Sequence, residues 1–139
     1  MPRLRVSREL FITAIVAVAV MSATCYYLRP PNPSYGDISI EQARRLIETN
    51  PDLVIVDVRT PEEFATGYLE GAVNLCVECD AQLLLDNLDP NDDILLYCRT
   101  GRRSANALEI LRENGYEKVY NILGGITAWV NAGYPTVDS

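Results

Sequence analysis

One short segment concentrates the residue types that activate a sulfur nucleophile. Residues 97–104 read Tyr-Cys-Arg-Thr-Gly-Arg-Arg-Ser, so three arginines and a glycine follow Cys98 within five positions. A cysteine between a strand and a helix faces the loop's backbone amides and the positive end of the helix dipole. These groups and the nearby arginines favour the thiolate, which is the reactive form. The sequence therefore predicts a lowered pKa and a nucleophilic role for Cys98.

The residues after Cys98 are expected to bind the substrate. Gly101 allows the loop to curl so that several N–H groups point inward and form an anion-binding nest. Arginine is a planar cation suited to oxyanions. Cysteine phosphatases and arsenate reductases need a Cys-x5-Arg loop, whereas position 104 here is serine, which disfavours phosphoryl chemistry. The expected substrate-binding residues are Arg99, Thr100, Gly101, Arg102, Arg103 and Ser104.

Composition narrows the functional classes. A chain of 139 residues is enough for one domain. The net charge of −7 argues against nucleic acid as a partner, because phosphate binding needs a basic surface. The absence of histidine excludes Cys-His catalytic pairs and histidine metal sites. We expect no metal and no cofactor, and a small anion as the ligand of the arginine-rich loop.

The first part of the chain has the composition of a membrane or export segment. Residues 10–28 carry no charge, and as a helix they would extend about 28 Å, close to the thickness of a bilayer core. Basic residues precede this stretch, which predicts a cytoplasmic N-terminus and a domain on the extracytoplasmic (periplasmic) side. Residues 1–29 are interpreted as a signal anchor, with a cleaved signal peptide as the close alternative and lipidation of Cys25 as a weaker one.

The remainder divides into a linker and a domain. Residues 30–36 contain three prolines and are expected to form a stiff spacer. Residues 37–137 alternate strand and helix patterns, which predicts an α/β fold with a mostly parallel sheet and helices on both faces. The expected strands are 53–56, 72–75, 94–97 and 119–122. The expected helices are 39–50, a short one from Thr60, 79–87, 104–114 and 126–131.

Three segments fall where such sheets bind ligands, beyond the carboxyl ends of the strands. They are 57–59, 76–79 and 98–104. For Asp57 and Arg59 we weigh a place in the site against a salt-bridge network with Glu62, Glu63 or Glu70 that braces the active loop, and favour the second. Cys76 and Cys79 lack a second pair for zinc. Incidental or structural thiols, including a disulfide, and a redox role both stay open.

Together these motifs resemble the rhodanese-like sulfurtransferases. The resemblance covers about residues 36–135 and rests on the segment around Cys98 and on four further motifs. One departure is Tyr68, where a histidine is usual in the family. The four motifs are Asp57-Val58-Arg59, Glu63-Phe64, Gly67-Tyr68-Leu69-Glu70-Gly71-Ala72-Val73-Asn74-Leu75, and Gly124-Gly125-Ile126-Thr127-Ala128-Trp129 with Gly133-Tyr134-Pro135.

The resemblance implies a rhodanese-like fold and a two-step sulfur transfer. Cys98 would take the outer sulfur of a thiosulfate-like donor as a persulfide, and cyanide, a thiol or a protein acceptor would then receive it. An alternative is a membrane-anchored module that carries sulfur or senses redox state without turning over small donors. Trp129 is expected in the core.

Overall fold

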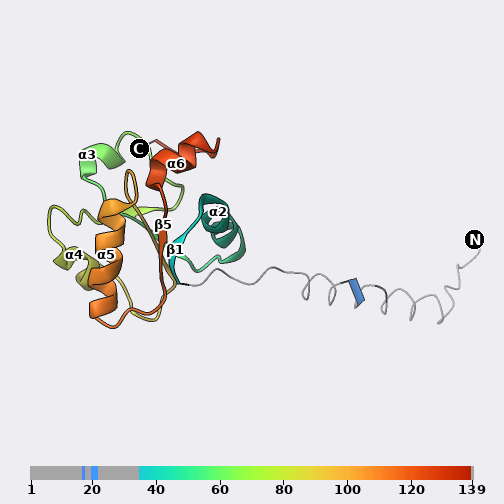
Figure 1. Ribbon diagram of the computed structural model, residues 1–139, viewed down its shortest axis with the longest axis horizontal. Helices are drawn as coiled ribbons and strands as arrows, with labels where there is room; N and C mark the ends of the chain where they lie inside the picture. Colours follow the sequence, from blue (N-terminus) through green and yellow to red (C-terminus); the bar gives the residue numbers. More distant parts are fainter. Residues whose placement is uncertain (1–16, 18–19, 22–34, 139) are drawn as a thin grey trace, which may run out of the picture. The chain divides into compact units, whose positions relative to one another are not determined.

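Strands and helices alternate in the computed structural model, which describes residues 17, 20, 21 and 35–138 (Figure 1). The strands of residues 35–138 are β1 (Gly36–Ile38), β2 (Val54–Asp57), β3 (Val73–Asn74), β4 (Ile94–Tyr97) and β5 (Val119–Ile122). The helices of the same part are α2 (Ile40–Thr49), α3 (Pro61–Phe64), α4 (Gln82–Asn87), α5 (Arg102–Glu113) and α6 (Gly125–Asn131). In the described residues no helix has the length and apolar character needed to cross a bilayer. The predicted segment 10–28 lies almost wholly outside them.

The five strands form one parallel sheet in the order β1-β5-β4-β2-β3. This confirms the predicted α/β fold with helices around a parallel sheet. Strand β1 was not predicted, and it begins at Gly36, the last position of the expected linker. Its three residues carry too short a pattern to identify a strand. They form a strand because they pair in parallel with β5, which aligns Gly36 with Tyr120 and Ile38 with Ile122.

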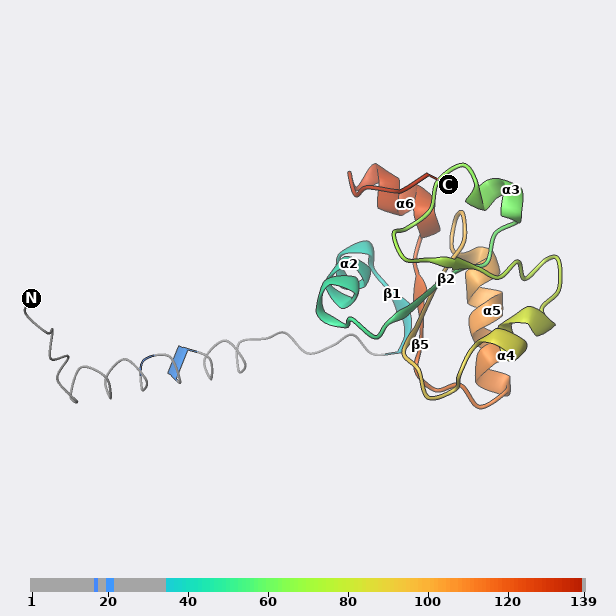
Figure 2. The same ribbon diagram turned by 180° about the vertical axis from the view of Figure 1, so that it is seen from behind.

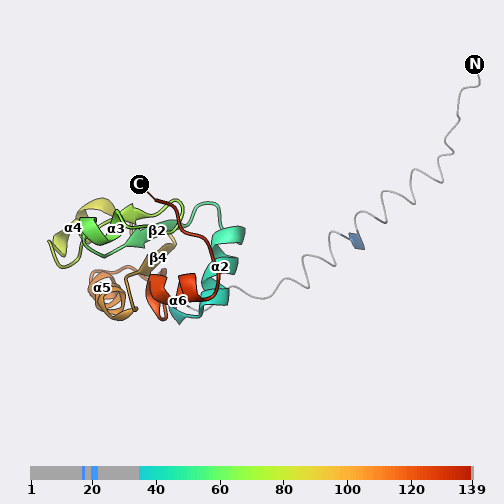
Figure 3. The same ribbon diagram turned by 90° about the horizontal axis from the view of Figure 1, so that it is seen from above.

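Two hydrophobic cores lie on opposite faces of the sheet, and successive strand residues enter them alternately. In β4, Leu95 and Tyr97 join one core while Ile94 and Leu96 join the other. Helices α2 and α6 cover the first face, and α4 and α5 cover the second, as Figure 3 shows from above. Trp129 is buried in the first core, as expected. The full burial of β4 holds the residue that follows it, Cys98, in a fixed place.

Local signals account for most helix boundaries, and two expected boundaries were wrong. Ser39 and Thr60 both form capping boxes at the starts of α2 and α3. Helix α5 begins at Arg102, two residues before the expected start, because Gly101 turns the chain directly into it. Helix α4 begins at Gln82 rather than at 79, since a tight turn occupies residues 77–79.

Candidate active site

Cys98 follows the last residue of β4 and is buried, with 1% of its surface exposed. The chain leaves the strand through Arg99 and Thr100, both exposed, and enters α5 after Gly101. Gly101 has a φ of +94°, and a side chain there would approach the backbone nitrogen of Gly124 to 3.1 Å. A glycine is therefore required on both conformational and steric grounds. The predicted curled loop is present.

Hydrogen-bond donors surround the sulfur of Cys98. The Gly101 N–H donates to Sγ at 3.1 Å, and the buried Ser104 hydroxyl lies 3.4 Å from it. Burial is the largest influence on the thiol and raises its pKa. The Ser104 hydroxyl and the N–H groups of Ser104, Thr100 and Gly101 act in the opposite direction and together leave the pKa of Cys98 lowered. This donor cluster at the start of a twelve-residue helix favours a thiolate.

The start of α6 is hydrogen-bonded to the active loop, residues 98–104. The N–H of Ile126 donates to the Cys98 carbonyl at 2.9 Å, and the N–H of Thr127 donates to the Arg99 carbonyl at 3.1 Å. Gly125 makes this approach feasible, because a Cβ at this position would lie 2.3 Å from the Cys98 carbonyl oxygen. No local pattern in the sequence predicts this supporting role. Its only signal was the Gly124-Gly125 pair.

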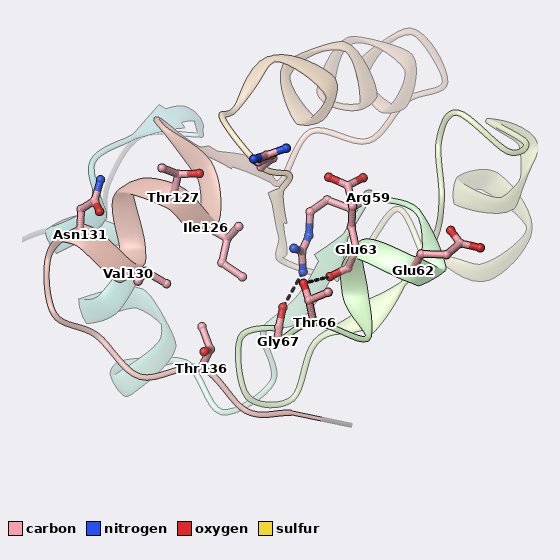
Figure 4. A pocket seen from close by; sticks show the side chains of 11 residues that line it. Arg59, Glu62, Glu63, Thr66, Gly67, Ile126, Thr127, Val130, Asn131 and Thr136 are labelled. Carbon is pink, nitrogen blue, oxygen red and sulfur yellow. Dashed lines mark hydrogen bonds between the residues drawn. The ribbon is translucent and has the colours of Figure 1, made fainter.

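An open pocket of about 600 Å³ lies beside the loop, between α3 and α6. Figure 4 shows Arg59 and Glu63 on one side of it and Ile126, Thr127 and Val130 of α6 on the other. Both helices stand at the same end of the sheet (Figure 2). Arg99 also lines the pocket, whereas Cys98 is not part of its wall. A ligand in this pocket therefore meets the loop first through Arg99.

The three loop arginines have different surroundings. Arg102 and Arg99 are exposed, and Arg99 borders the pocket. Arg103 instead pairs with two carboxylates, Glu63 at 2.7 Å and Glu78 at 2.9 Å. The hydrogen bond from Arg103 lowers the pKa of Glu63 to about 2. Arg103, which was expected to bind substrate, thus joins α5 to α3 and to the turn after β3.

Asp57 and Arg59 form a buried ion pair with each other. The guanidinium of Arg59 contacts both Asp57 carboxylate oxygens, with a shortest distance of 2.6 Å, and it also donates to the Gly67 carbonyl at 2.7 Å. The sequence predicted a network with Glu62, Glu63 or Glu70, whereas in the structure Arg59 pairs with Asp57. Arg59 also lines the pocket. Arg59 thus forms a structural ion pair and also lines the pocket, while bracing of the active loop stays a prediction.

Cys76 and Cys79 are joined by a disulfide. Among the described residues Cys98 is the free cysteine. Glu78, between the two bonded cysteines, carries the contact to Arg103. Tyr68, which the sequence singles out as a departure from the resemblance, stacks on Phe64 with ring centroids 4.0 Å apart.

Comparison with known proteins adds independent support. Residues 39–132 match the rhodanese-like domain family. A protein named sulfurtransferase from Allochromatium vinosum is 37% identical over 102 residues, which cover 73% of this chain and 94% of that protein. Thiosulfate sulfurtransferase 18 from Arabidopsis thaliana is 35% identical over 111 residues, covering 70% and 80% of the two chains.

A solved structure extends the similarity to the fold. The rhodanese-related protein from Thermoplasma volcanium has a TM-score of 0.67 and 27% identity, covering 76% of this chain and all of that one. The relatives named as sulfurtransferases support sulfur transfer as the general activity. By its matched residues, its fold and its relatives, the chain belongs to the rhodanese-like domain family.

Proposed function

We propose that the domain is a sulfurtransferase in which Cys98 carries sulfur as a persulfide. The Cys98 thiolate attacks the outer sulfur of thiosulfate or a similar donor, and the S–S bond of the donor breaks to release sulfite. A second nucleophile, cyanide or a thiol, attacks the outer sulfur of the persulfide and regenerates the thiolate. Metal ions and cofactors take no part in these steps.

The observation that carries this proposal is the donor cluster at Cys98 Sγ. The N–H of Gly101 and the hydroxyl of Ser104 point at the sulfur, and the pKa of the thiol is lowered in spite of its burial. The same fixed donors suit the negative charge that a persulfide places on its outer sulfur, and they need no rearrangement to act. Arg99 is exposed and lines the pocket, which supports a role in attracting an anionic donor.

Intact-mass measurement tests the covalent step. The full chain is treated with thiosulfate and desalted, and we expect a gain of one sulfur atom that maps to Cys98 and disappears on addition of cyanide. The Cys98→Ser variant should gain nothing, while the matched variant with both Cys76→Ser and Cys79→Ser should gain sulfur as the wild type does. Sulfur that persists in Cys98→Ser would contradict the proposal.

Steady-state turnover separates an enzyme from a carrier. Thiocyanate production from thiosulfate and cyanide is expected from the wild type and should be absent from Cys98→Ser. A stable persulfide without turnover would favour the sulfur-carrier function instead. Hydrolysis of p-nitrophenyl phosphate is expected to be absent, because serine occupies position 104.

We also propose that residues 10–28 anchor the chain in a membrane, with the domain on the extracytoplasmic side. The uncharged stretch and the basic residues before it support this orientation. The Cys76–Cys79 disulfide supports an oxidising compartment. Carbonate extraction of membranes tests the anchor, protease accessibility tests the side, and the N-terminal mass of the mature protein identifies cleavage. Recovery of the intact chain in the cytoplasmic soluble fraction would overturn this proposal.

A further inference from the structure

The disulfide after β3 takes no part in the proposed sulfur transfer. Its two sulfurs differ in their surroundings, because Cys76 is buried, with 4% of its surface exposed, while Cys79 is exposed. A reagent in solution therefore reaches the bond at Cys79. Exposed disulfides are more readily exchanged than buried ones.

One contact favours Cys76 as the leaving thiolate, whereas its burial disfavours the charge. The backbone N–H of Cys79 donates to Cys76 Sγ at 3.1 Å. When a nucleophile takes Cys79, the electron pair of the broken bond goes to Cys76, and a donor is already in position to stabilise that charge. Disulfide exchange is faster when the leaving sulfur is the better thiolate. The exposure of Cys79 and the hydrogen bond to Cys76 Sγ together favour attack at Cys79 and departure of Cys76.

We expect the fold to persist when this disulfide is reduced. The two cysteines are three positions apart in the sequence, so the bond closes a short loop and restricts the unfolded chain little. The turn has other supports: the N–H groups of Cys79 and Asp80 both donate to the Cys76 carbonyl at 3.1 Å, and Glu78 pairs with Arg103. The bond can therefore open while the surrounding structure stays folded.

We propose that Cys76–Cys79 is a thiol–disulfide exchange site whose reductant is an external dithiol. One thiolate of the dithiol bonds to Cys79 Sγ, the Cys76–Cys79 bond breaks, and Cys76 leaves as a thiolate. The second thiol of the reductant then attacks the other sulfur of the reductant, which is bonded to Cys79 in the mixed disulfide, and Cys79 is released. The protein gains two electrons and two protons, and the reductant loses the same number and becomes a disulfide.

Reduction of the folded protein is the first test. The probe is dithiothreitol, applied to the full chain carrying Cys25→Ser and Cys98→Ser so that the remaining cysteines are Cys76 and Cys79. Alkylation and mass measurement at intervals should show two thiols appearing while the circular dichroism spectrum stays native. Reduction that occurs only together with loss of the native spectrum would overturn the proposal.

The polarity is tested with single-cysteine chains. In the same background, adding Cys76→Ser leaves Cys79, and adding Cys79→Ser leaves Cys76. We expect dithiobis(nitrobenzoate) to react with Cys79 faster by about tenfold or more, because Cys76 is shielded from solvent. Equal rates, or a faster Cys76, would refute attack at Cys79. These chains lack Cys98, so the result stands apart from the outcome of the sulfur-transfer experiments.

Discussion

Gly125→Ala is a sharp test of how the active loop is positioned. The new Cβ would lie 2.3 Å from the Cys98 carbonyl oxygen, where ordinary contact begins at 3.4 Å, so the two segments must separate by about 1 Å. Two hydrogen bonds cross this contact, from Ile126 to Cys98 and from Thr127 to Arg99. Displacement of the loop weakens both of them.

The expected magnitude follows from these contacts. Weakening two hydrogen bonds costs about 1 kcal/mol each, and alanine at a φ of +58° adds about 1–2 kcal/mol. We therefore expect the free energy of unfolding to fall by about 3–4 kcal/mol. A displacement of about 1 Å at a reacting group can cost about a hundredfold in rate. The value of kcat/KM for thiosulfate should fall by about that factor.

Gly115→Ala provides the matched control. Gly115 has a φ of +88°, and a Cβ there would meet no atom within 4 Å. This variant carries the conformational strain without the collision, so it should lose about 1–2 kcal/mol of stability and keep its activity. Urea unfolding and steady-state kinetics measure both variants. If Gly125→Ala keeps kcat/KM within about twofold, or is no less stable than Gly115→Ala, the contact with α6 does not position Cys98.

Three further predictions concern the polar network of the site. Ser104→Ala removes a donor 3.4 Å from the Cys98 sulfur. The pKa of Cys98 should therefore rise, and alkylation of Cys98 at neutral pH should slow by up to about tenfold. If the pH dependence of the alkylation rate is unchanged, the Ser104 hydroxyl does not stabilise the thiolate. The pKa of Glu63 is lowered from 4.5 to about 2, chiefly by a hydrogen bond from an arginine of α5, so its pairing stabilises the folded state above pH 4.5 and is lost as the pH falls toward 2. As the pH falls from above 4.5 toward 2, the free energy of unfolding of Glu63→Gln should fall by about 1–2 kcal/mol less than that of the wild type, after allowance for solvent screening. Urea unfolding across this pH range measures the difference, and an equal fall in both proteins would contradict the prediction. Asp57→Asn leaves Arg59, which is 4% exposed, without its partner carboxylate. The free energy of unfolding measured with urea should therefore fall by about 3–5 kcal/mol. A fall of less than about 1 kcal/mol would mean that the pair does not stabilise the fold.

Much of the site was predictable from the sequence because its chemistry is local in the chain. Cys98, Gly101 and Ser104 lie within seven consecutive residues, between a buried strand and a helix. Over so short a distance the strand-to-helix turn alone brings N–H and O–H donors to the sulfur. The same reasoning covers the parallel sheet and the capped starts of α2 and α3, whose signals are contained in a few neighbouring residues.

Contacts between distant parts of the chain were decided only by the tertiary structure. Arg103 is an active-loop neighbour in the sequence, yet it pairs with Glu63, forty residues away. Strand β1 exists because β5 pairs with it, and Gly125 matters because α6 packs on the loop that holds Cys98. No local pattern encodes these contacts, since each depends on which surfaces meet when the whole chain packs around its two cores.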